Sequence, residues 1–357
     1  MMTNTLDTYV LKNEFVKLCL TQEGGHMAPV YFNLGNGRWA QPYSIAPWNS
    51  QGRKEADLPV VLKNLRGDFF CFPFGENPSE TSHIHGETAN GKWELLEKTD
   101  NSLAVMLEMQ DVKGKVIKRI NTKETFLYVE HEIDGVTGDF TYGHHAILQL
   151  PPDQSSYVKT SSFDFGSVLP IPFDSPENGE YSNLKVSHQF NALSNVQTKF
   201  GQVVSFESHP FQAGYDDLLM VSKSTNQVAW TALQTPDYVW ISIKTTTQFP
   251  STLFWNSNGG RHPFPWDGKH SNRLGIEEIC GYFNLSIEEA KRNKLPNDIS
   301  TFKHFDGEKT SLKNIQGIVP TNTSWGKFLG ISISTNGLTI NFENEVVEVG
   351  VDVGFLG

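Results

Sequence analysis

The sequence predicts an all-β protein, a large β-sandwich with about one short helix. Short alternating or apolar segments recur between turn signals along the 357 residues, and only one segment has the signals of a helix. Hydrophobic residues make up 38% and charged residues 19% of the chain, which is the balance of a globular protein. Regularly spaced strands favour a sandwich or barrel over an α/β sheet. We therefore expect one domain that spans residues 1–357.

The candidate strands are short runs with alternating or continuous apolar residues, bounded by turn residues. Asn336-Gly337, between two such runs, is typical of a two-residue hairpin. The fifteen candidates are Phe15–Leu20, Met27–Phe32, Trp93–Glu97, Leu103–Met109, Val116–Asn121, Phe126–Ile133, Ala146–Leu150, Val203–Glu207, Leu218–Ser222, Val228–Leu233, Tyr238–Lys244, Thr252–Trp255, Phe328–Ser334, Leu338–Phe342 and Val346–Val351.

The one clear helix begins at Ser286, which forms a capping box with Glu289, and it continues until Pro296. Four stretches rich in glycine and proline are expected to be long loops, and three of them adjoin the clusters described below. Long loops on a rigid scaffold commonly carry function. These loops are Pro42–Lys54, Asn77–Asn90, Pro151–Asn183 and Asn256–Asn272.

The bulk charge of the chain excludes several classes of partner. The net charge is −11, which argues against nucleic acid and against anionic membrane surfaces, because both attract basic patches. The first residues contain no signal-peptide core, and no apolar stretch approaches the roughly 20 residues that span a bilayer. The three cysteines are widely spaced and odd in number, so we expect them to be reduced. These features predict a cytoplasmic protein.

A late segment contains adjacent carboxylates, Glu277 and Glu278, in a run that is expected to form a strand. Side chains alternate across a strand, so only one of the two can enter a given cleft. A glutamate held among apolar neighbours has a raised proton affinity and can act as a base near neutrality. The alternative is a pair of surface charges on an edge strand.

Two upstream histidine clusters supply candidate acids and ligands. His144 and His145 precede an apolar run and should lie at the mouth of a buried strand, where an imidazole can donate a proton or simply be hydrogen-bonded in the core. His83 and His85 share one face if the chain is extended. With Glu87 they are candidate metal ligands, although His-x-His alone is a weak metal signal, and they can equally bind hydroxyl groups. We predict no metal.

Two further segments contain candidate ligand-binding residues. Arg66 precedes a run of aromatic residues and is either solvated or directed into a cleft as a hydroxyl donor. A proline-pinned loop contains Arg261, Trp266 and Asp267, and an exposed tryptophan beside hydrogen-bonding groups suits carbohydrate. No glycine-rich phosphate loop, Gly-x-Ser-x-Gly elbow or Cys-x-x-Cys pair is present, which argues against phosphate-using and serine-nucleophile enzymes.

The order of these motifs resembles that of the aldose 1-epimerases, the galactose mutarotase-like family. His85-Gly86 followed by Trp93 is similar to the His-Gly-Gly…Trp segment of the family. Gly143-His-His-Ala-Ile-Leu-Gln-Leu150 is similar to its Thr-Asn-His-Ser-Tyr-Phe-Asn-Leu segment.

The resemblance implies specific roles for several residues. It aligns His145 with the catalytic acid, and Gly275-Ile-Glu277 resembles the segment with the catalytic base. Arg66 lies where the family has a substrate-binding arginine. The implied fold is a β-supersandwich with a sugar cleft, and the implied reaction opens and recloses an aldose ring with no cofactor. Glu277 is the expected base and Glu278 the alternative.

The chain departs from the family pattern at several positions. Glu87 replaces the second glycine of His-Gly-Gly, His144 replaces an asparagine, and Glu278-Ile follows the glutamate. The main hypothesis is mutarotation of an aldose or related sugar by Glu277, His145 and His85. The alternatives are a carbohydrate-binding protein without turnover on the same scaffold, and a related lyase or hydrolase. A glycoside hydrolase usually needs two carboxylates that flank the bond to be cleaved, and the sequence offers only one such candidate, Glu277.

Overall fold

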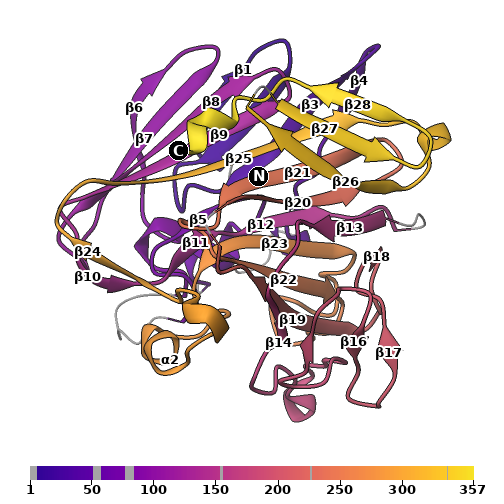
Figure 1. The fold of residues 1–357 in the computed structure, drawn as a ribbon. Coiled ribbons are helices and arrows are strands. Elements are labelled where there is room, and N and C mark those ends of the chain that lie inside the picture. The colour runs from indigo at the N-terminus through magenta and orange to yellow at the C-terminus, as the bar shows by residue number, and fades with distance from the viewer. Residues whose placement is uncertain (1–5, 51–57, 77–83, 153–155, 226, 336) are drawn as a thin grey trace.

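The computed structural model describes residues 6–50, 58–76, 84–152, 156–225, 227–335 and 337–357. Two large antiparallel sheets form the body of the fold (Figure 1). The eight-stranded sheet has the order β15 (Gln189–Phe190), β14 (Phe165–Val168), β19 (Tyr215–Ser222), β22 (Ser251–Asn258), β23 (Arg273–Cys280), β11 (Tyr142–His144) and β5 (Phe70–Cys71), and β12 (Ala146–Gln149) also pairs with β23.

The nine-stranded sheet lies above the eight-stranded sheet in Figure 1. Its order is β18 (Ser208–His209), β13 (Ser156–Thr160), β20 (Val228–Gln234), β21 (Tyr238–Thr245), β25 (Thr310–Pro320), β9 (Phe126–Asp134), β8 (Lys115–Lys123), β7 (Ser102–Glu108) and β6 (Glu94–Lys98). The main core combines apolar residues from one face of each sheet, among them Trp240 from β21 and Ile276 from β23.

Smaller sheets complete the sandwich. β1 (Thr8–Lys12), β2 (Val16–Thr21), β3 (Met27–Gly35) and β4 (Arg38–Ala40) form a four-stranded sheet whose apolar residues join the main core. β26 (Phe328–Ser334), β27 (Gly337–Phe342) and β28 (Val346–Val349) form the C-terminal sheet, drawn in yellow in Figure 1. Two-stranded pairs are β10 (Thr137–Phe140) with β24 (Lys303–Asp306), and β16 (Val196–Gln197) with β17 (Val203–Val204).

Helices are short and few in the described residues. They comprise α1 (Val60–Lys63), α2 (Ile287–Arg292) and single 3₁₀ turns. α2 is the expected helix: the backbone N–H of Glu289 donates to the Ser286 hydroxyl at 3.4 Å, but the helix ends four residues before Pro296. No helix in this part of the chain combines the length and the apolar character that crossing a membrane requires.

The expected all-β class is confirmed, and most expected strands are present with shifted ends. The hairpin between β26 and β27 forms, with Asn336 outside the described residues. One loop prediction was wrong: Pro151–Asn183 contains β13 and β14. Both strands are short and are flanked by polar and turn residues, so the alternation of apolar and polar residues that indicates a strand is weak there.

Candidate functional site

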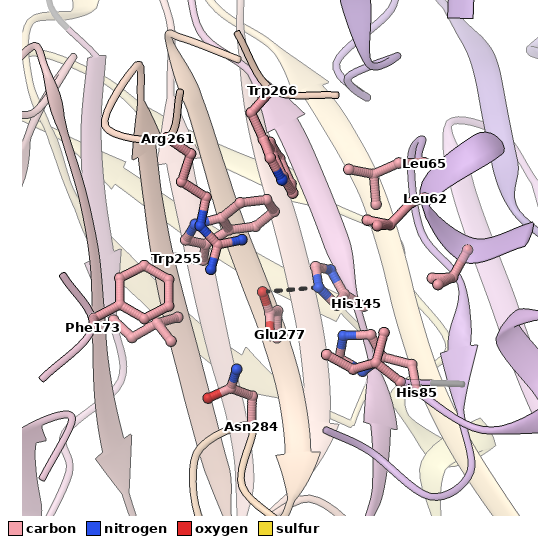
Figure 2. Close-up of a pocket in the computed structure, with 13 residues that line it drawn as sticks. Leu62, Leu65, His85, His145, Phe173, Trp255, Arg261, Trp266, Glu277 and Asn284 are labelled. Carbon is pink, nitrogen blue, oxygen red and sulfur yellow. Dashed lines mark ion pairs between the residues drawn. The ribbon is translucent and has the colours of Figure 1, made fainter. Parts of the chain in front are cut away.

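A pocket of about 580 Å³, which includes its part open to solvent, lies on the face of the eight-stranded sheet that is turned away from the main core (Figure 2). Most of the wall is apolar, with a few polar groups. The lining residues are Val61, Leu62, Leu65, Ile84, His85, His145, Phe173, Leu218, Trp255, Arg261, Trp266, Glu277 and Asn284.

Glu277 and His145 meet because of strand register. β11 and β12 pair with β23 in the same register, on either side of His145, which itself belongs to neither strand. This shared register sets His145 opposite Glu277. Cross-strand neighbours on one face have closely spaced side chains. The distance from His145 Nε2 to Glu277 Oε1 is 3.4 Å, and both side chains are almost fully buried. Figure 2 marks this pair at the base of the pocket.

Gly275 makes room for the carboxyl group. It lies two residues before Glu277 on β23, on the same face, with Trp255 of β22 as its cross-strand partner. A Cβ atom at position 275 would lie 2.6 Å from Glu277 Oε1 and 3.0 Å from Trp255 Cβ. An alanine here would therefore push the Glu277 carboxyl group out of its position, which gives a steric reason for the Gly-Ile-Glu motif.

Burial shifts the pKa values of Glu277 and His145 in opposite directions. It raises the pKa of Glu277 well above its ordinary value, and burial, followed by the nearby His85 and His26, lowers the pKa of His145 well below the usual range. Both directions have one cause, because a low-dielectric site disfavours the charged form of each group. Both shifts favour a proton on Glu277 over a proton on His145.

His85 is a fixed neutral donor. Its Nδ1 accepts a hydrogen bond from the backbone N–H of Gly75 at 3.1 Å, so Nε2 carries the proton. Burial lowers the pKa of His85 to about 3, so the ring is neutral at pH 7. The ring centroids of His85 and His145 are 5.0 Å apart at 90°. His85 adopts φ 68°, a left-handed conformation that the following Gly86 shares.

Aromatic rings hold His145 in place. Phe69 stacks on its imidazole with a centroid distance of 4.6 Å, and His26 stacks on the other face of Phe69 at 4.2 Å. Trp255 meets the imidazole edge-on at 5.9 Å. The backbone N–H of His145 donates to Phe69 O at 2.9 Å. These contacts fix the ring plane relative to Glu277, which proton transfer requires.

The loop between β22 and β23 supplies the opposite wall of the pocket. The Arg261 guanidinium lies 4.6 Å from the Phe173 centroid and 5.0 Å from the Trp266 centroid. The Asp216 carboxylate anchors this loop, because it accepts from the backbone N–H groups of Gly260 at 2.9 Å and Asn258 at 3.1 Å. Burial is the largest influence on Asp216 and raises its pKa.

Five of the nine expected site residues line the pocket: Glu277, His145, His85, Trp266 and Arg261. His144 was wrongly expected to bind substrate. Its side chain is fully buried on the opposite face of the sheet, where Nδ1 lies 2.9 Å from Asp68 Oδ2. The alternation of side chains along a strand separates it from His145.

The remaining expectations also differ from the structure. Arg66 and Asp267 are not among the lining residues, so their expected contact with substrate is not supported: Arg66 Nε donates to Asn64 O at 3.1 Å, and Asp267 pairs with Lys269 at 3.6 Å. His83 lies outside the described residues. Glu87 accepts from the backbone N–H groups of Gln110 and Asp111, so it does not join His85 as a metal ligand.

The described ranges contain no cluster of three or more His, Cys, Asp or Glu side chains suited to a metal. Sequence reasoning missed the lining residues Trp255, Phe173 and Asn284. Trp255 could have been predicted, because Gly275 has no side chain and its cross-strand neighbour must cover it. Phe173 and Asn284 lie in irregular segments, where sequence alone carries no register.

No protein-family model matches the sequence, and a search of curated proteins finds no significant match. Solved structures match most of the chain. A candidate aldose 1-epimerase from Escherichia coli K12 has a TM-score of 0.60 at 13% identity, covering 89% of this chain and 100% of its own. A galactose mutarotase-like protein from Clostridium acetobutylicum has a TM-score of 0.59 at 14% identity, covering 90% and 97%. A GalM/aldose epimerase homologue from C. elegans has 0.55 at 11% identity, covering 89% and 100%. The chain therefore has the fold of the aldose 1-epimerases and galactose mutarotase-like proteins.

Proposed function

We propose that the protein is an isomerase that interconverts the anomers of an aldose or related sugar. The observation that carries the proposal is the 3.4 Å approach of Glu277 and His145 at the base of a pocket that aromatic and polar side chains line. His85 adds a neutral N–H donor beside them, and Trp255 and Trp266 add flat apolar surfaces of the kind that sugar rings contact.

The reaction needs one base and one acid. The base removes the proton of the anomeric hydroxyl, the C1–O bond of the ring breaks as the aldehyde C=O forms, and the acid protonates the ring oxygen. Rotation about the C1–C2 bond and reversal of the same steps give the other anomer. The two groups exchange protonation states on opening and recover them on closure, so no cofactor is consumed.

Glu277 and His145 hold the single proton that this cycle requires. Transfer of a proton from Glu277 to His145 Nε2 gives a carboxylate base and an imidazolium acid with no change in total charge. A sugar whose anomeric hydroxyl contacts Glu277 and whose ring oxygen contacts His145 would hydrogen-bond to both charged forms and so favour the transfer. His85 can donate to a sugar oxygen but, with its low pKa, does not supply a mobile proton.

The first prediction is that Glu277→Gln abolishes catalysis. The amide keeps the shape of the side chain but can neither accept nor release the proton, so we expect a loss of about 10²–10⁴-fold in interconversion rate. Polarimetry of a freshly dissolved anomer measures the rate. Calorimetric titration with the same sugar should give affinity within about tenfold of the wild type, because the amide oxygen can still accept a hydrogen bond from the anomeric hydroxyl.

Two outcomes contradict the proposal. Full turnover by Glu277→Gln excludes Glu277 as the base. Sugar binding by the wild type without any acceleration of interconversion favours a carbohydrate-binding protein that lacks turnover.

A further inference from the structure

Arg261 is a cation built into the wall of the pocket. Its side chain is 24% exposed, and its guanidinium lies against the rings of Phe173 and Trp266. Figure 2 shows the guanidinium reaching from its loop into the space above Glu277. Two aromatic contacts orient the planar group before any ligand arrives, so little side-chain entropy remains to be lost on binding.

The guanidinium retains its hydrogen-bonding capacity. It donates no hydrogen bond to any side chain or backbone group of the described residues, and its Nε is buried without an acceptor. Glu180 Oε1 is 3.6 Å from Nε, which is an ion pair but exceeds hydrogen-bond distance. Asp216, the other nearby carboxylate, already accepts from Ser257, Trp255 and the backbone of its loop.

Arg261 is the main fixed charge among the described residues that line the pocket, and its ion-pair partner Glu180 lies outside that lining. Among the described lining residues the other acidic or basic groups are Glu277, His85 and His145. Burial favours the neutral form of each of these three groups. A neutral sugar offers only hydroxyl groups to a desolvated guanidinium, whereas a carboxylate matches both its charge and its forked geometry.

The position of the cation fits one sugar class. In the pyranose form of a hexuronic acid the carboxylate is attached to C5, the carbon bonded to the ring oxygen that the acid must protonate. A sugar held by its anomeric hydroxyl and ring oxygen near Glu277 and His145 therefore projects its carboxylate only a few bonds from the reacting atoms. One guanidinium neutralises one carboxylate, but it would leave a phosphate dianion half compensated.

We propose that the sugar bound in this pocket is a hexuronic acid and that Arg261 binds its carboxylate. This inference rests on the proposed function for the orientation of the ring, but its test is a binding measurement. Titration calorimetry at pH 7 compares galacturonate, galactose and galactose 6-phosphate, and the corresponding gluco series. We expect at least one uronate to bind about tenfold or more tightly than its neutral parent.

Variants assign the preference to the residue. Arg261→Gln should bring uronate affinity down to that of the neutral sugar, and Arg261→Lys should retain part of the preference because it keeps the charge. Lys269→Gln removes one positive charge from the same loop, at a residue outside the pocket lining that pairs with Asp267, and should leave the preference intact. Circular dichroism and thermal melting establish that each variant is folded. If Arg261→Gln does not fold, the Arg261→Lys comparison decides.

The outcomes separate this inference from the proposed function. Equal affinity for uronate and neutral sugar, a preference that survives Arg261→Gln, or a preference for the phosphate each overturns the uronate assignment, even if anomers are interconverted. An Arg261-dependent uronate preference in a protein that never accelerates interconversion supports the carboxylate site and overturns the isomerase proposal.

Discussion

Glu277 and Glu278 are chemically identical neighbours that occupy opposite environments. Glu277 faces the pocket with His145 as its polar neighbour. Glu278 faces the interior between the two large sheets, where it forms an ion pair with Lys244 and accepts a hydrogen bond from the Thr252 hydroxyl at 2.7 Å. Adjacent positions on one strand therefore give Glu277 no cation as a partner and give Glu278 a lysine that compensates its charge.

The raised pKa of Glu277 predicts a pH-dependent stability difference between the wild type and Glu277→Gln. Well below pH 4 the carboxyl group is protonated in both the folded and the unfolded state. As pH rises the unfolded chain releases the proton first, so the folded state loses about 1.4 kcal/mol of stability per pH unit until its own pKa is passed. Glutamine does not titrate. The variant should therefore gain at least about 1 kcal/mol over the wild type between pH 4 and pH 7.

Urea unfolding at a series of pH values measures this difference. His145 titrates in both proteins and with the opposite sign, since its pKa is lowered, so the difference between the two proteins reports the Glu277 carboxyl group together with its effect on His145. A difference that stays constant with pH would mean that Glu277 has the same pKa in the folded and the unfolded chain, which contradicts the raised pKa.

For individual residues, the sequence could predict which residue types belong to the site and which strand face they occupy, but not the distances between them. Glu277, His145 and His85 could be predicted because chain order and strand alternation limit where they can point. His144 could not be separated from His145, since the strand containing them is interrupted at His145 and the sequence does not reveal which imidazole faces the core. Arg66 and Asp267 were nominated from their neighbours in sequence, which do not determine the side-chain direction.

Among the elements, β25 shows why some strands escape sequence reasoning. It spans 11 residues in the middle of the nine-stranded sheet, but it was absent from the expected strands. Asn314 and Gln316 interrupt its apolar pattern although both are buried: Asn314 Nδ2 donates to Ser242 Oγ at 3.1 Å, and Gln316 Oε1 accepts from Tyr43 at 2.6 Å. Buried polar residues with tertiary partners have the pattern of exposed ones.

The ion pair between Lys244 and Glu278 connects β21 of one large sheet with β23 of the other. Removing one partner leaves an uncompensated buried charge, so Glu278→Leu or Lys244→Met should each lower the free energy of unfolding by about 3–5 kcal/mol. The double variant Lys244→Met/Glu278→Leu should recover most of that loss, because an apolar pair requires no charge compensation.

A double-mutant cycle by urea unfolding tests the pair. Each single variant should also reduce the interconversion rate per folded molecule only modestly, since Glu277 and not Glu278 faces the pocket. Additive single and double effects would mean that the two side chains stabilise the sandwich independently, which contradicts a coupled bridge between the sheets.

The protein consists of stacked sheets, and the pocket and the C-terminal sheet lie at opposite sides of the stack. The pocket opens on the free face of the eight-stranded sheet, whereas the C-terminal sheet covers the outer face of the nine-stranded sheet through a separate apolar cluster. Figure 1 shows the C-terminal sheet on the side opposite β14, β19 and β22. Strand content and motif order predicted the sandwich, but they did not reveal how many smaller sheets would cover its faces, because that depends on tertiary pairing.

This separation predicts that the stability of the C-terminal sheet and the chemistry of the pocket can be altered independently. Phe328 begins β26, is fully buried and lies edge-on to Trp230 of β20 with a centroid distance of 5.7 Å. Phe328→Ala should lower the free energy of unfolding by about 3–5 kcal/mol through the cavity it leaves. The adjacent Leu329 is 55% exposed, so Leu329→Ala is the matched control and should change stability by at most about 0.5 kcal/mol.

Urea unfolding gives the stabilities of Phe328→Ala and Leu329→Ala, and polarimetry under conditions where each variant remains folded gives the rate per molecule. Both variants should retain the wild-type rate, because no residue of the C-terminal sheet lines the pocket. A loss of rate in folded Phe328→Ala would mean that the packing of the C-terminal sheet is transmitted through the nine-stranded sheet and the main core to β23. The layers would then act as one mechanical unit, and the position of Glu277 would depend on contacts two layers away.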